Sequence, residues 1–70
     1  MRRDRIDVAG AVTLRHHSRL RKIKVGRAHA WTRVLMLVAG LEIRIVNEDG
    51  ELLRSLTLDP DRIYQPLNPD

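Results

Sequence analysis

Apolar and polar residues alternate along two segments of the chain, residues 11–15 and 41–46. Successive side chains of a β-strand point to opposite faces, so a period of two is typical of a strand that buries one face. We therefore expect both segments to be strands. The side chains expected to face the core are Val12, Leu14, Leu41, Ile43 and Ile45.

Two further segments alternate less regularly, and each places an arginine among its inward-facing positions. Arg21 falls in phase with the apolar residues of segment 20–25, and Arg54 does the same in segment 52–58. A β-bulge adds one residue to a strand and so shifts the phase of alternation. We expect a bulge or a strand end near Arg21 and a bulge near Arg54.

The remaining segments differ from simple alternation. Residues 34–39 form a continuous apolar run, which fits a strand buried on both faces or the central strand of a tightly curled barrel. Residues 5–7 are expected to pair with the strand at 11–15 as the first arm of a hairpin, which places Ile6 in the core. Residues 26–33 show no alternation and open with glycine, so they predict an ordered loop with room for one helical turn.

Short strands joined by tight turns, with almost no helical periodicity, predict an all-β fold. The chain of 70 residues makes one domain at most, and closing the sheet would leave few strand edges exposed. We expect a small five-stranded SH3-like barrel over residues 1–58 and an extended, Pro-containing tail over residues 59–70, either docked or disordered. The alternative fold is an open three-stranded meander that needs a partner.

Composition limits the kinds of site and the cellular compartments that fit this chain. The chain contains no cysteine, which excludes disulfides and thiolate zinc sites and suits a reducing compartment. Its longest apolar run is far shorter than the roughly 20 residues that cross a bilayer, and no leader pattern opens the sequence. We expect a cytoplasmic protein that makes no contact with a membrane.

Charge is strongly polarised along the chain. Residues 1–33 carry ten of the 13 Lys and Arg residues but only two of the nine acidic ones, whereas residues 34–70 carry three cations and seven acidic residues. Such asymmetry is expected where one face of a protein meets a polyanion, although a solvated surface can look similar. Nucleic acid is the polyanion that this pattern favours.

Several short segments together resemble a known family. They read VTLR at residues 12–15, VGRAHA at 25–30, GELLR at 50–54 and LTLDP at 56–60. Their order and spacing are similar to the C-terminal end of bacterial insertion-sequence transposases with a retroviral-integrase (DDE) catalytic core. The resemblance implies a C-terminal β-barrel domain that holds DNA, separate from the upstream core that carries the catalytic metal site. Trp31 and Arg33 depart from the family's pattern, which has small residues and often proline there.

The basic cluster at residues 15–24 is the main candidate site. Alternation along a strand sends every second cation to the same face, where several can meet phosphates of one DNA molecule. Gly26 can bring the backbone close to a phosphate beside Arg27. The predicted DNA-binding residues are Arg15, His16, His17, Arg19, Arg21, Lys22, Lys24, Arg27 and Arg33.

Other residues favour structural roles. Trp31 can stack on a base, but in a chain without phenylalanine it is expected to cover one end of the barrel. His29 is expected to be a satisfied structural group beneath the turn at Gly26. The histidines lack a fourth zinc ligand, and the acidic residues lie in turns and the tail, so no metal, cofactor or catalytic residue is predicted.

The sequence therefore predicts a non-catalytic domain that grips double-stranded DNA, either transposon-end or target DNA, mainly through phosphates. The alternative is an interaction barrel that docks on the transposase catalytic core or on another transposase subunit, with its basic face against acidic protein. Neither interpretation involves a small-molecule substrate.

Overall fold

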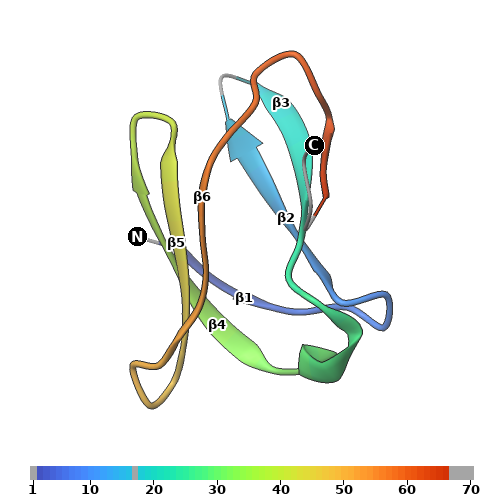
Figure 1. The fold of residues 1–70 in the computed structure, drawn as a ribbon, viewed down its shortest axis with the longest axis vertical. Coiled ribbons are helices and arrows are strands. Elements are labelled where there is room, and N and C mark those ends of the chain that lie inside the picture. The colour runs from blue at the N-terminus through green and yellow to red at the C-terminus, as the bar shows by residue number, and fades with distance from the viewer. Residues whose placement is uncertain (1, 17, 67–70) are drawn as a thin grey trace.

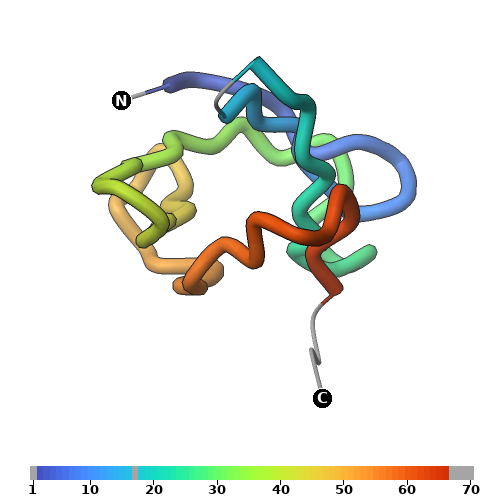
Figure 2. The backbone as a smooth tube through the Cα atoms, turned by 90° about the horizontal axis from the view of Figure 1, so that it is seen from above, coloured from blue at the N-terminus to red at the C-terminus, as the bar shows by residue number. Residues whose placement is uncertain are grey.

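The computed structural model describes residues 2–16 and 18–66, and these form an all-β fold, as predicted (Figure 1). One sheet has the strand order β1-β4-β5-β6 and the other the order β2-β3-β7. Seen from above, the backbone runs around a common interior (Figure 2). The first sheet contains β1 (Arg2–Arg5), β4 (Arg33–Ala39), β5 (Glu42–Asn47) and β6 (Leu52–Thr57). The second contains β2 (Ala11–His16), β3 (Arg19–Lys24) and β7 (Tyr64–Gln65), and the short 3₁₀ helix η1 (Arg27–His29) leads into β4.

Both sheets contribute to one hydrophobic core. The fully buried side chains include residues from each sheet and from the segments that connect them, so burial of apolar surface ties the two sheets together. Of the predicted inward-facing residues, only Leu41 is exposed, because it lies in the turn between β4 and β5. The core consists of Ile6, Val12, Leu14, Ile23, Val25, Val34, Met36, Ile43, Ile45 and Leu58.

The N-terminal segment pairs differently from the prediction. Residues 5–7 do not form a hairpin arm against β2; instead β1 lies antiparallel to β4, with Arg5 opposite Arg33. Asp7 turns the chain between the two sheets, and its carboxylate accepts the backbone N–H groups of Ala9 and Ala11. Ile6 is nevertheless fully buried, as predicted. The hairpin from which that prediction followed is therefore wrong, although its placement of Ile6 in the core is right.

The expected bulges have different outcomes. The register between β5 and β6 shifts beside Ile45, which confirms the irregularity predicted near Arg54. The pairing of β2 with β3 is regular throughout, so the bulge or strand end predicted near Arg21 is wrong. Arg21 instead stays on the inward face, because a backbone carbonyl of the C-terminal segment accepts its hydrogen bond.

The apolar run in β4 is buried on one face only. Val34 and Met36 point into the core, whereas Leu37 is exposed and Leu35 half-buried. The prediction of a strand buried on both faces is therefore wrong, since no element of the described chain covers the outer face of β4. The strand does lie inside its sheet, between β1 and β5.

The described part of the tail is docked. Gln65 is buried and pairs in parallel with Ile23, while its side-chain amide bonds to the backbone of Asp59. Arg54 donates to the carbonyl oxygens of Lys24, Gln65 and Pro66, and its burial lowers the pKa of its guanidinium. A guanidinium thus links β6, β3 and the tail through backbone acceptors alone.

Candidate nucleic-acid interface

The outer face of β2 and β3 presents two of the predicted cations. Arg15 pairs across the strands with Leu20, and Lys22 pairs with Thr13, and all four side chains are exposed. Tyr64 of β7 lies opposite Lys22 and is also exposed. This face therefore combines positive charge with accessible side chains, as the alternation predicted.

Arg21 is not part of that face. Its relative exposure is 4 %, and its Nη1 donates to the carbonyl oxygen of Arg62 at 2.8 Å. The prediction that Arg21 contacts DNA therefore has no support in the structure. Its position between Leu20 and Lys22 follows strand periodicity, which puts neighbouring residues on opposite faces.

Lys24 is also engaged within the protein. It is half-buried, and its Nζ donates to the carbonyl oxygen of Ala9 in the turn before β2. This hydrogen bond holds the ammonium against the fold, in contrast to the exposed Lys22.

The tip of the β2–β3 hairpin holds further predicted residues. Arg19 is exposed and lies opposite His16, whose Nε2 is 3.2 Å from the carbonyl oxygen of Gly40. Ser18 adopts a positive φ of 66° in the turn. His17 lies outside the described residues. His16 therefore faces the β4–β5 turn, and Arg19 is the accessible cation at this tip.

The segment after β3 is the predicted loop with one helical turn, η1. The N–H of Gly26 donates to the carbonyl oxygen of Gly10 at 2.9 Å, so it is not available to a phosphate. His29 is half-buried beside Gly26, with its Cδ2 3.6 Å from the position of a Cβ on that glycine. Its role as a satisfied structural group stays a prediction. Arg27 is exposed at the start of η1 and can still meet an anion.

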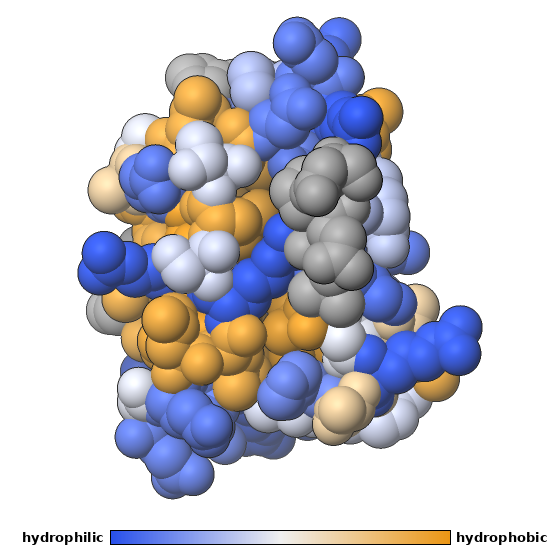
Figure 3. All heavy atoms as spheres, viewed as in Figure 1, coloured by the Kyte–Doolittle hydropathy of each residue, from blue (hydrophilic) through white to orange (hydrophobic). Residues whose placement is uncertain are grey.

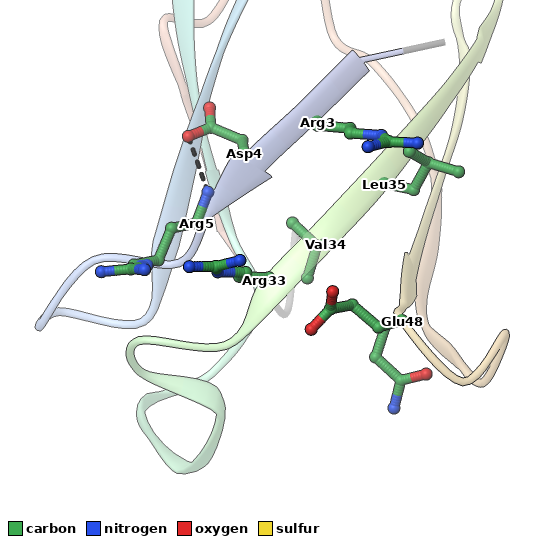
Figure 4. A pocket seen from close by; sticks show the side chains of 8 residues that line it. Arg3, Asp4, Arg5, Arg33, Val34, Leu35 and Glu48 are labelled. Atoms are coloured by element: carbon green, nitrogen blue, oxygen red, sulfur yellow. Dashed lines mark hydrogen bonds between the residues drawn. The ribbon is translucent and has the colours of Figure 1, made fainter.

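A second basic group forms where β1 meets β4. Arg33, a predicted site residue, lies directly opposite Arg5, and Arg3 lies opposite Leu35 on the same two strands. The three arginines and Glu48 line an open concavity of about 540 Å³ (Figure 4). Sequence reasoning missed Arg3 and Arg5 because it paired residues 5–7 with the wrong strand and predicted no strand at Arg3. The alternation of arginines around Asp4 could have shown that they share one face.

Trp31 does not cover the end of the fold. Its relative exposure is 62 %, and its φ is 68°, so the predicted core role is wrong. The residue lies between η1 and β4, two positions before Arg33, the first residue of that strand. Its exposed position is compatible with the other role considered for it, stacking on a base.

Most of the exposed cations have no hydrogen-bond or ion-pair partner for their side chains within residues 2–16 and 18–66. Among the described residues, their side chains make no hydrogen bond and no ion pair, whereas Arg62 pairs with Asp59 at 3.6 Å. Some carboxylates accept hydrogen bonds from other groups instead. Asp7 accepts one from the backbone N–H of Ala11 in a turn, and Glu42 accepts one from the hydroxyl of Thr57 on the neighbouring strand. The unpaired cations are Arg2, Arg3, Arg5, Arg15, Arg19, Lys22, Arg27, Arg33 and Arg44.

Within the described ranges, no group of three or more potential metal-ligating side chains comes together. The described chain also contains no helix of the length and apolar character needed to cross a membrane. Comparison of the sequence and fold with protein-family models, curated proteins and solved structures finds no match.

Proposed function

We propose that this chain is a non-catalytic DNA-binding domain that grips the phosphate backbone of double-stranded DNA. The observation that supports the proposal is the set of exposed cations whose side chains have no partner among the described residues, concentrated in the first half of the chain. Unpaired surface cations retain their full charge for an external polyanion, and phosphate contacts supply most of the affinity of non-specific DNA binding. The resemblance to integrase-type transposases favours transposon-end or target DNA as the ligand.

The size of the molecule suits such contacts. Its longest dimension is 30 Å, close to the roughly 34 Å of one turn of B-DNA. Arg15, Arg19 and Lys22 on the second sheet can then meet several phosphates on one side of a duplex. Little base preference is expected, because these contacts position the protein without reading bases.

The test is a fluorescence-anisotropy titration of a labelled duplex at several salt concentrations. If about four to six phosphates are neutralised, affinity falls roughly 10²–10³-fold between 50 and 200 mM salt. The double variant R15E/K22E should lose binding and flatten the salt slope. R44E/R62E is the matched control, because it changes net charge by the same amount on residues outside the proposed face. Equal losses in the two variants would show that only net charge matters.

A second candidate function has its own observation. Leu35, Val46 and Leu52 lie side by side across β4, β5 and β6 on the outer face of the first sheet, and Leu52 is 54 % exposed. Hydrophobic residues also gather over the β5–β6 side of the surface (Figure 3). An apolar sheet face is suited to docking on another protein, here the transposase catalytic core or another subunit. Two results together would favour this alternative. The parent would not bind duplex DNA at low salt, and it would bind such a catalytic core or subunit, whereas the L52K variant would not.

A further inference from the structure

We propose that Trp31 stacks on an unpaired base of a DNA strand whose phosphates lie against Arg3, Arg5 and Arg33. The inference rests on the proposed DNA binding and adds a class of substrate to it, namely DNA with unpaired bases. It concerns the end of the first sheet where β1 pairs with β4, and not the outer face of β2 and β3.

Most of the Trp31 side chain is accessible to solvent. Trp31 is 62 % exposed, and within the described chain its ring makes no hydrogen bond or ring contact. Only its backbone N–H is engaged, at 2.7 Å from the carbonyl oxygen of Ile6. An aromatic ring with this much exposed surface is available to stack on a ligand.

The backbone conformation at Trp31 is unfavourable for a tryptophan. A φ of 68° lies in the left-handed region, which glycine adopts freely and a bulky side chain adopts only under constraint. The turns at Gly40 and Gly50 use glycine at comparable angles of 60° and 84°. Strained residues held by their surroundings cluster at functional sites, and an exposed tryptophan at such an angle fits that pattern.

The backbone of Trp31 adjoins the strands that carry the arginines: Trp31 lies two residues before Arg33 and is hydrogen-bonded to Ile6, which follows Arg5. The hydrogen bonds that join Ile6 with Trp31 and Thr32 continue the ladder in which Arg5 pairs with Arg33. Like charges directly opposite each other destabilise a sheet. Asp4 and Glu48 also line this concavity, but among the described residues neither carboxylate forms an ion pair with Arg5 or Arg33. In Figure 4, the Arg5 and Arg33 side chains extend toward the same side of the two strands. An anion in this concavity would relieve the repulsion.

Together these groups match a nucleic acid strand with free bases. Arginines that hold the backbone, beside an aromatic ring that stacks on a base, are the two components of single-strand binding sites. A base inside a duplex is already stacked on its neighbours and cannot offer its face to Trp31. The site therefore favours single-stranded DNA or an unpaired end over continuous duplex.

The experiment compares the parent with W31A, W31F and W31G on three labelled ligands: a single-stranded oligonucleotide, its duplex, and a strand of equal length with abasic sites throughout. W31A should weaken single-strand binding roughly 5- to 150-fold, the range expected for loss of one base–aromatic stack. W31F should retain most of the affinity, whereas duplex and abasic strands should bind W31A and the parent equally. Because the chain has one tryptophan, quenching of its fluorescence by the single strand reports stacking directly.

W31G separates binding from stability. Since glycine suits the positive φ and the side chain is exposed, W31G should be at least as stable as W31A while binding the single strand as weakly. Unchanged single-strand affinity in W31A, with duplex binding intact in the parent, would overturn the inference and leave the proposed function standing. Equal losses of W31A on all three ligands would overturn it too, by showing that the indole only supports the loop. Failure of the parent to bind any of the three would refute both proposals.

Discussion

Gly10 and Gly26 touch backbone to backbone. The carbonyl oxygen of Gly10 accepts the N–H groups of Val25 and Gly26, and a Cβ on Gly10 would lie 2.4 Å from the carbonyl carbon of Gly26. The contact joins the turn before β2 to the end of β3. It thereby sets the direction in which the chain enters η1 and the strand that carries Arg33.

We expect Gly10→Ala to destabilise the domain severely. The φ of Gly10 is 82°, and left-handed backbone costs a non-glycine residue about 1–2 kcal/mol before any overlap is counted. Gly50→Ala is the matched control, because its φ is 84° but no atom lies within 4 Å of an added Cβ. Thermal unfolding should show a much larger loss in the first variant. Equal losses would mean that the backbone contact relaxes at little cost.

Ile43→Asp should prevent folding. Ile43 is fully buried on β5, and an unpaired carboxylate in an apolar core costs several kcal/mol, comparable with the roughly 5 kcal/mol available to a small domain. Leu41→Asp, at a residue 38 % exposed in the preceding turn, should fold. Circular dichroism with a thermal melt measures both variants. A cooperative β-type melt of Ile43→Asp would show that this core assignment is wrong.

The neighbours Arg21 and Lys22 should respond oppositely to charge reversal. Arg21 is buried against the tail carbonyl of Arg62, so Arg21→Glu places an unpaired negative charge inside and should cost about 3 kcal/mol or more. Lys22 is exposed, and Lys22→Glu should change stability by only about 0.5 kcal/mol while weakening duplex binding. Chemical denaturation and anisotropy on the same two proteins test this. If Arg21→Glu is stable but no longer binds DNA, Arg21 belongs to the DNA-binding surface after all.

Asp7 should give the fold an acid-sensitive contribution. The backbone N–H of Ala11, aided by that of Ala9, lowers the pKa of Asp7 below its ordinary value. A group whose folded pKa is lowered stabilises the fold above its unfolded pKa and loses that effect as pH falls through the folded value. The parent should therefore exceed Asp7→Ala in stability at neutral pH, and the gap should narrow below about pH 4. A gap that stays constant down to pH 2 would contradict this account. Asp7→Asn keeps an oxygen acceptor and should lie between the two at neutral pH.

The sequence by itself determined the fold class and most of the core. Alternation is a local property of the chain, so it placed Val12, Ile43 and Ile45 inward without knowledge of their neighbours. It also located the turns and the polarised charge, because glycine position and charge are read residue by residue. The same local reading put Arg21 in phase with the core residues, but the expected bulge and the predicted DNA contact were both incompatible with its buried position.

Only the tertiary structure decided how the strands pair and which cations meet. Strand partners are set by contacts between residues far apart in the chain, and so β1 joined β4 and brought Arg5 opposite Arg33. Arg21 could stay inward because the returning tail supplied an acceptor, a contact 41 residues away along the sequence. Trp31 became an exposed residue because the backbone after η1 turned through a positive φ to reach Ile6. Periodicity records which face a side chain takes, whereas the partner across that face depends on the path of the whole chain.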